Sequence, residues 1–365
     1  MRKGAAKLHK DGFYTCYIYY IYAIFFKVKN KNKLIMTDFF DDKISDRLGG
    51  LNFGKSTVIY KFELIKRAKA AAKLAHPDVK LIDMGVGEPD WPADNLVVEA
   101  LSEEAGKPGN RWYADNGIPE FQEAAAGYLE RVYGVKGISA SANIVHGIGS
   151  KPVLAMLPLC FINPGDILLT TVPGYPVTAT YTRYLGGEVY NLQLLESNSF
   201  LPDLDSIPEA VLNKARLLYI NYPNNPTGAV ADRKFFEKVV KFAKENNIVV
   251  INDAAYGALT YDGYKPLSFL SVDGAIDVGI EVHSLSKAFN MTGWRMGFVC
   301  GNARAVSAYA TVKDNTDSGQ FRAIQKAGIM ALNNTGITEK TVTKYSRRFY
   351  LLVNALNEAD FDAKK

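Results

Sequence analysis

From about residue 140 onward, short apolar runs alternate with longer segments whose apolar residues recur at helical spacing. Short apolar runs bounded by turn residues are typical of buried strands. Residues 233–246, RKFFEKVVKFAKEN, instead place their apolar side chains on one face, as an amphipathic helix does. Seven strands are predicted, at 143–147, 167–172, 188–194, 217–223, 248–256, 279–286 and 296–301. This alternation predicts an α/β protein with three α/β/α layers around a mostly parallel seven-stranded sheet.

The flanks of this region have a different pattern. Residues 36–84 and those after about 325 are helical or irregular, and we expect them to form a smaller α/β domain. The predicted division is a leader at 1–35, an arm with part of the small domain at 36–84, a large domain at 85–325, and the start of an incomplete C-terminal small domain at 326–365. In open α/β sheets, ligands bind at the carboxyl ends of the strands. Those ends are therefore where a site is expected.

The leader contains the apolar stretch FYTCYIYYIYAIFF, residues 13–26, flanked by lysines. It is shorter than the roughly 20 residues that a membrane-spanning helix needs, and KVKNKNK after it offers no small-residue cleavage site. We expect residues 1–35 to be translated upstream sequence, with the natural start at Met36. The alternative is a simple membrane-attachment segment.

The net charge of +5 belongs to that leader. Residues 1–35 contain eight lysines and arginines against one aspartate, so the remainder carries −2. A slightly acidic body argues against nucleic acid as a partner. The three cysteines and four histidines show neither a CxxC pair nor ligand spacing, so no metal site or disulfide is expected. This cysteine usage fits a reducing cytoplasm.

The first two strand ends carry residues suited to an anion and a flat ring. Ser150 and Lys151 follow strand 143–147 where a helix should begin, and free N–H groups at a helix N-terminus suit a phosphate. The simpler interpretation is a plain helix start, because no Walker motif is present. Tyr175, in VPGYP after strand 167–172, could stack on a heterocycle or be an ordinary core tyrosine.

Two further strand ends carry polar side chains. Asn225 lies in PNNPTG after strand 217–223, and a simple loop is the alternative interpretation. Asp253 follows an apolar run, with Tyr256 three residues later. A carboxylate so placed is costly unless it meets a cation or several donors, and a structural salt bridge would also satisfy it.

The stretch SLSKAFNMTGWRMG, residues 284–297, adds a lysine among anion-binding side chains. Ser284 and Ser286 offer hydroxyls, and Arg295 can grip an anion with two N–H groups. Lys287, near an arginine and at an apolar sheet edge, should have a lowered pKa and act as a nucleophilic amine. No carboxylate lies near it in the sequence.

Together these side chains describe one ligand, a flat aromatic cation with a phosphate and an aldehyde. Asp253 would keep a pyridine nitrogen protonated, while Tyr256 and Asn225 would bond a phenolic oxygen and Tyr175 would stack on the ring. Lys287 would condense with the aldehyde. The phosphate would be held by Ser150, Lys151, Ser284, Ser286 and Arg295. This ligand is pyridoxal 5′-phosphate, which serves enzymes as an electron sink.

With these landmarks the chain resembles the fold-type I pyridoxal-phosphate aminotransferases of class I/II. The matching motifs, in family order, are GVGEPD (85–90), YADNGIPEFQEA (113–124), VPGYP (172–176), NYPNNPTG (221–228), NDAAY (252–256) and SLSKAFNMTGWRMG. The resemblance implies a cytoplasmic homodimer with shared active sites, in which Tyr113 reaches the partner's cofactor. It also implies that Gly87 lines the substrate carboxylate site through its backbone.

Within that family, residues 54–63, 111–125 and 313–328 are most similar to LL-diaminopimelate aminotransferases. The resemblance implies ping-pong transfer of an amino group from LL-2,6-diaminopimelate to 2-oxoglutarate, yielding tetrahydrodipicolinate and glutamate for lysine biosynthesis. Tyr60 and Ser318 would then lie on the substrate side. The alternatives are aspartate or other amino-acid transamination, or a C–S lyase using the same cofactor and fold.

One departure concerns the substrate. The family holds the substrate α-carboxylate with an arginine near its C-terminus, whereas this sequence ends at EADFDAKK and offers only Arg347 and Arg348 before it. We therefore expect a C-terminal truncation of a longer protein, able to bind cofactor but poor at transamination.

Overall fold

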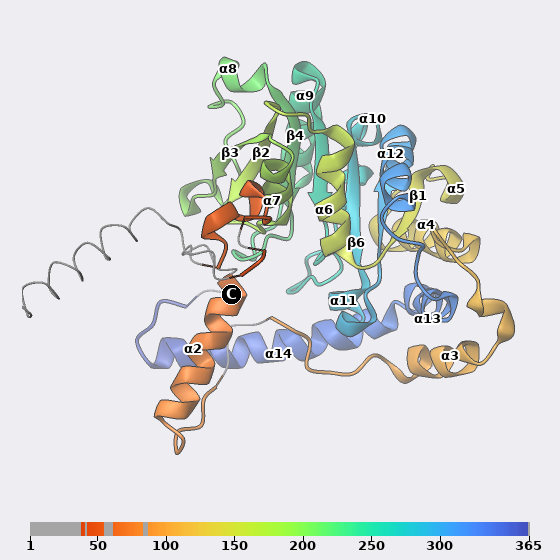
Figure 1. Cartoon of the computed structure of the whole chain (residues 1–365). Coiled ribbons are helices and arrows are strands. Elements are labelled where there is room, and N and C mark those ends of the chain that lie inside the picture. The colour runs from red at the N-terminus through yellow and green to blue at the C-terminus, as the bar shows by residue number, and fades with distance from the viewer. Residues whose placement is uncertain (1–37, 41, 55–60, 83–86, 364–365) are drawn as a thin grey trace, which may run out of the picture. The chain divides into compact units, whose positions relative to one another are not determined.

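The computed structural model describes residues 38–40, 42–54, 61–82 and 87–363 (Figure 1). The leader at 1–35 lies outside these residues. By compactness the chain divides into two units, residues 1–85 and 86–365. The predicted boundary near residue 325 stays a prediction. The described part of the first unit contains two short 3-10 helices, η1 (Asp46–Leu48) and η2 (Gly50–Asn52), and the helix α2 (Lys61–Ala75).

The second unit contains seven strands, all in one sheet, and every strand predicted from the sequence is present. Their bounds are β1 (Ile144–Gly147), β2 (Ile167–Val172), β3 (Glu188–Gln193), β4 (Ala215–Asn221), β5 (Val249–Asp253), β6 (Gly279–Ser284) and β7 (Gly297–Gly301). Their order is β1-β7-β6-β5-β4-β2-β3, and only β7 runs antiparallel to its neighbours. The mostly parallel seven-stranded sheet is confirmed.

Helices connect and cover these strands (Figure 1). The longer ones are α3 (Asn95–Ala105), α4 (Pro119–Tyr133), α6 (Ser150–Phe161), α7 (Val177–Tyr184), α9 (Arg233–Asn246), α12 (Ala303–Asp314), α13 (Arg322–Asn333) and α14 (Gly336–Glu358). The short ones are α5 (Ala140–Asn143), α8 (Glu209–Leu212), α10 (Ala275–Val278) and α11 (Leu285–Ala288), with 3-10 turns η3 (Pro108–Arg111), η4 (Glu196–Asn198), η5 (Phe269–Ser271) and η6 (Thr292–Trp294).

The amphipathic segment 233–246 forms α9 with the predicted bounds. Asp232 caps its first turn by accepting a hydrogen bond from Phe235 N at 2.7 Å. At the other end Asn247 adopts a left-handed conformation with φ 54°, which stops the helix. The apolar face, including Phe236 and Val239, is buried against the sheet core.

Two hydrophobic clusters lie on opposite faces of the sheet, which makes the three layers. Along β4, Leu217 and Tyr219 belong to one cluster, whereas Leu218 and Ile220 belong to the other. Successive strand side chains point to opposite faces, so the whole strand is buried only if helices cover both. Residues from α6, α7 and α12 complete the first cluster, and residues from α4, α9 and α13 complete the second. The predicted α/β/α arrangement is confirmed.

The antiparallel direction of β7 has a consequence for the site. β1 through β6 share one direction, so they end at one edge of the sheet, while β7 begins at that edge. Arg295 directly precedes β7, and Lys287 follows β6. Both residues therefore lie at this same edge of the sheet. Among the helices that the structure describes, none has the length and apolar character to cross a bilayer.

Candidate active site

Lys287 lies on α11, the short helix that starts directly after β6. Ser284 ends the strand and caps this helix, its Oγ accepting from Ser286 N at 3.2 Å. The Lys287 Nζ donates to the carbonyl oxygen of Gly87 at 2.8 Å. Burial lowers the pKa of Lys287; the charge of Glu88 opposes this and that of Arg295 adds to it. The direction is the one expected, but the sequence analysis missed Glu88, which lies far away along the chain.

Asp253 ends β5 and is only 4% exposed. Its Oδ2 accepts from the hydroxyl of Tyr219 at 3.1 Å, and its Oδ1 accepts from Ala255 N at 3.2 Å. Burial raises its pKa to about 6 against the effect of these hydrogen bonds and of the charge of His283. Among the described residues no lysine or arginine is paired with it, so the alternative of a structural salt bridge receives no support.

Tyr219 is a residue that the sequence analysis missed. It lies inside β4, is fully buried, and has a pKa raised well above its usual value by burial and then by Asp253. Its hydroxyl is thus a fixed neutral donor to the carboxylate. One signal could have indicated Tyr219: it lies two residues before Asn221, and Asn221 pairs with Asp253 at the end of β5.

Asn221, also missed, ties the ends of β4 and β5 together. Its Nδ2 donates to the main-chain oxygen of Asp253 at 2.7 Å, and its Oδ1 accepts from Asn225 N at 2.8 Å. Tyr256 follows on the same edge, where burial and then the Asp253 charge raise the pKa of its phenol. Asn225, Asp253 and Tyr256 are therefore brought together, as the motif order predicted.

The predicted phosphate residues meet at the start of α6. Gly149 precedes Ser150, the first residue of that helix, with φ 78°. A Cβ on Gly149 would lie 2.3 Å from Nη2 of Arg295, so the guanidinium lies directly against this turn. A Cβ on Gly297 would lie 3.3 Å from Ser150 N, so β7 passes just behind. Lys151 is on the exposed side of the helix, and Tyr175 is half-buried beside the cluster containing Tyr219.

A cleft of about 810 Å³ opens at Lys287, a volume within the range of small-molecule sites, and the phosphate residues and Asp253 are not among the residues that line it. Of the predicted residues, Gly87, Asn225, Tyr256 and Lys287 line it, and side chains from α14 form another wall. Tyr113 and Ser318 are exposed and are not among the lining residues. Tyr60 lies outside the described residues.

Ion pairs tie α14 to the segment that begins at Gly87. Asp90 accepts from Lys344 Nζ at 2.5 Å and from Arg348 Nη2 at 2.9 Å, and these bonds, that of Arg348 first, lower the pKa of Asp90 far below its usual value. Lys344 also lies 3.9 Å from the centre of the Trp91 ring. Arg348, one of the two candidates considered for the substrate carboxylate, is thus engaged by Asp90.

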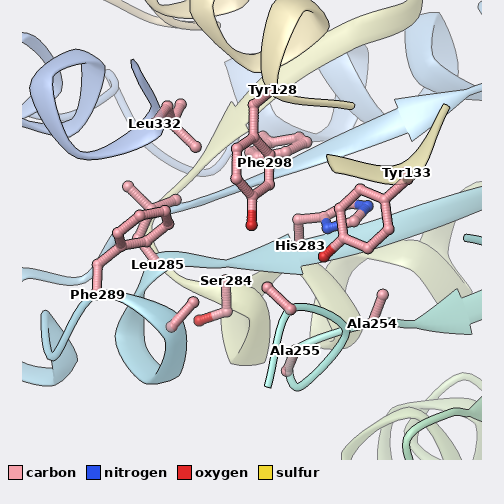
Figure 2. Close-up of a pocket in the computed structure, with 12 residues that line it drawn as sticks. Tyr128, Tyr133, Ala254, Ala255, His283, Ser284, Leu285, Phe289, Phe298 and Leu332 are labelled. Carbon is pink, nitrogen blue, oxygen red and sulfur yellow. The ribbon is translucent and has the colours of Figure 1, made fainter. Parts of the chain in front are cut away.

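A second, much smaller cavity lies behind the sheet edge (Figure 2). The hydroxyls of Tyr128 and Tyr133 point into it, beside His283 and Ser284. Its volume of about 10 Å³ suits at most one water molecule. His283 Nε2 bonds the fully buried Glu281 at 2.7 Å. Burial would raise the pKa of Glu281, but hydrogen bonds, first that from His283, lower it. This cavity is too small for a substrate.

The chain is similar to known aminotransferases. The family model described as aminotransferase class I and II matches residues 79–365. An LL-diaminopimelate aminotransferase of Methanocaldococcus jannaschii is 59% identical over 90% of this chain and 78% of its own length. That of Methanococcus maripaludis is 58% identical over 90% of this chain and 79% of its own. The substrate-bound BacF structure from Bacillus subtilis is 38% identical, with a TM-score of 0.78, covering 83% of this chain and 76% of that one.

Proposed function

Because the chain belongs to the class I and II aminotransferases, we propose that it transfers the amino group of LL-2,6-diaminopimelate to 2-oxoglutarate. The products are tetrahydrodipicolinate and glutamate, on a route to lysine. The observation that carries this assignment is the 59% identity to an LL-diaminopimelate aminotransferase over 90% of the chain. On this proposal the residues around Lys287 and Asp253 would serve the same reaction.

The cofactor proposed for this reaction is pyridoxal 5′-phosphate, and the residues present fit it. Asp253 is a buried carboxylate with no cationic partner among the described residues, as a protonated pyridine nitrogen requires. For the phosphate of the cofactor, the first turn of α6 and the Arg295 guanidinium offer N–H donors. Lys287 lies on α11, at the same edge of the sheet, as an amine of lowered pKa.

When bound, the cofactor supplies an electron sink that makes the α-hydrogen of an amino acid acidic. Lys287 would then be the base: its Nζ takes the proton from the α-carbon of the donor amino acid in the first half-reaction, and it gives a proton to the α-carbon of the new glutamate in the second. Burial favours the neutral amine that this step needs. Tyr219 and Ala255 hold the two oxygens of Asp253 in place, so that this carboxylate could keep the ring nitrogen of the cofactor protonated. Asn225 and Tyr256 would bond the phenolic oxygen, and Tyr175 would stack on the ring.

The remaining predicted residues belong to the proposed homodimer. Tyr113 is 76% exposed and does not line the cleft of its own chain, which suits a side chain that serves the partner's cofactor. Ser318 and Tyr60 are proposed on the substrate side, and Gly87 presents its backbone in the cleft. The cytoplasm is the proposed location.

The substrate assignment predicts a clear preference. The purified enzyme should form glutamate from 2-oxoglutarate with LL-diaminopimelate at a kcat/KM at least about tenfold above that with aspartate. Aspartate is shorter and lacks the distal ammonium group of diaminopimelate, and a site built to bond such a group rejects substrates that lack it. Glutamate release and tetrahydrodipicolinate formation are measured together. A higher kcat/KM with aspartate would overturn the substrate, and release of pyruvate from cystathionine would favour the C–S lyase alternative.

The turn before α6 leads to a prediction about cofactor binding. Gly149→Ala should weaken cofactor binding about tenfold or more, since the new Cβ would meet the Arg295 guanidinium and the backbone has φ 78°. Gly165→Ala is the matched control, because Gly165 has φ 87° but no atom within 4 Å of its added Cβ. Equal cofactor affinity in the two variants, measured by absorbance titration, would show that the contact with Arg295 is unimportant.

A further inference from the structure

Arg295 has an unusual backbone for an arginine. It follows η6 with φ 56° and ψ 57°, the left-handed backbone conformation that residues other than glycine rarely adopt. Its Nη1 donates to Thr292 O at 2.7 Å, and Nη2 lies against Gly149. This conformation turns the guanidinium back toward the first turn of α6. Because it costs conformational energy, neighbouring contacts have to maintain it.

Gln320 supplies such contacts. Its Nε2 donates to Trp294 O at 2.8 Å and to Arg295 O at 3.0 Å, so one amide group holds both carbonyls around the left-handed residue. These two acceptors fix the orientation of the amide, because only its nitrogen side can donate to them. Gln320 lies between α12 and α13, 25 residues beyond Arg295 and within the segment 313–328, but it was not among the predicted site residues and does not line the cleft.

The other side of the Gln320 amide meets a buried histidine. Gln320 Oε1 lies 2.9 Å from Nε2 of His146, which is fully buried in β1 and packs edge-on against Phe121. Since Oε1 can only accept, His146 Nε2 carries the hydrogen. Burial and then the charge of Lys313 lower the pKa of His146 to about 4, which keeps the ring neutral. Its Nδ1 has no hydrogen-bond partner in the described part of the chain.

From this chain of contacts we propose that Gln320, oriented by His146, is a positioning residue for the cofactor phosphate. It holds the Trp294 and Arg295 carbonyls so that the Arg295 guanidinium stays at the start of α6. Gln320 itself touches neither substrate nor cofactor in this proposal. The inference rests on the proposed function, because it assumes that Arg295 binds the phosphate of pyridoxal 5′-phosphate.

The test compares two ligands that differ only in the phosphate. Gln320→Leu should weaken binding of pyridoxal 5′-phosphate about tenfold, since two hydrogen bonds that fix Arg295 are lost. Binding of pyridoxal, which lacks the phosphate, should change by less than about twofold. Dissociation constants are measured by absorbance titration of the cofactor-free protein. Gln122→Leu is the matched control, because Gln122 donates to the main-chain oxygen of Ile144, away from Arg295.

Two further variants make the result decisive. In an Arg295→Ala background, Gln320→Leu should have no additional effect on cofactor affinity, because the two residues act through one contact. Gln320→Asn keeps an amide but shortens its reach, and it should show the same selectivity to a smaller degree if Gln320→Leu does not fold. Equal losses for both ligands, or full additivity with Arg295→Ala, would make Gln320 a merely structural residue and overturn the proposal.

Failure of the proposed function has a different signature. If the unaltered protein binds no pyridoxal 5′-phosphate, the function fails while the anion site stays testable with inorganic phosphate. Phosphate should then raise the melting temperature of the unaltered cofactor-free protein more than that of Gln320→Leu. Equal phosphate shifts in the two proteins would overturn the positioning role independently of the cofactor.

Discussion

Replacing Lys287 by alanine should abolish transamination, with a loss of kcat of about 10⁴-fold or more. The lysine amine is the proposed base at the substrate α-carbon and the covalent anchor of the cofactor. Among the described residues, the hydrogen-bond partner of its Nζ is a main-chain oxygen, that of Gly87, which cannot act as a base in its place. The absorbance band of cofactor joined to lysine should also disappear. Turnover is measured by glutamate formation, and the absorbance spectrum is recorded on the same sample.

The controls separate chemistry from folding. Lys241→Ala removes a lysine of α9 whose side chain is 75% exposed, and it should leave both kcat and the spectrum unchanged. Lys287→Arg keeps the positive charge but not a neutral amine, so it should be as inactive as Lys287→Ala. Near-normal activity in either Lys287 variant would refute the assignment of the catalytic lysine and, with it, the proposed mechanism.

Replacing Asp253 by asparagine should lower kcat on the order of 10³-fold, while cofactor retention falls much less. The carboxylate is the group that would keep the pyridine nitrogen charged, whereas the phosphate residues and Lys287 would still hold the cofactor. The kcat and the cofactor dissociation constant are measured in parallel. Equal losses in the two quantities would argue against an electronic role for Asp253.

The same substitution should stabilise the cofactor-free protein at neutral pH. The pKa of Asp253 is about 6 when folded, above its ordinary value of 3.8, so the folded state binds the proton more tightly than the unfolded state does. Its contribution to stability is therefore fully present below pH 3.8 and is lost as the pH rises through about 6. The total is about 3 kcal/mol. Asp253→Asn removes this loss, and it should exceed the unaltered protein in stability at pH 8 by up to that amount.

Denaturant unfolding of both cofactor-free proteins between pH 5 and pH 8 measures this difference. The advantage of the variant should grow from pH 5 until the pH has passed about 6 and should then stay level up to pH 8. Bound cofactor should reverse it, because a pyridinium offsets the buried charge. An advantage that stays constant with pH would mean that Asp253 is not the titrating group. A carboxylate that destabilises the cofactor-free protein is expected in a binding site, whereas a carboxylate in a structural ion pair is not expected to do so.

Much of the fold could be predicted from the chain, because the strands are buried on both faces. A strand such as Ala215–Asn221 then contains a continuous buried run, residues 217–220, and the turn residues after it mark where it ends. The strand ends in turn indicated Asn225, Asp253 and Lys287, since ligands of such sheets bind at one edge. The direction of β7 could not be predicted, because side-chain periodicity is the same in parallel and antiparallel strands.

The contacts that tune the site depend on tertiary structure, because they join residues far apart in the chain. Glu88 influences Lys287, Tyr219 donates to Asp253, and Gln320 bonds the carbonyl of Arg295. Glu88 and Gln320 lie in the quoted segments 85–90 and 313–328, but nothing in the local sequence shows which distant residue any of these three partners contacts.

The proposed nucleophile, carboxylate and anion-binding arginine could therefore be predicted from the sequence, since each chemistry requires a particular side chain near a strand end. The pKa of Asp253 and the left-handed conformation of Arg295 could not, because burial and hydrogen-bond geometry arise only when β4, β5, β7 and the Gln320 segment pack together.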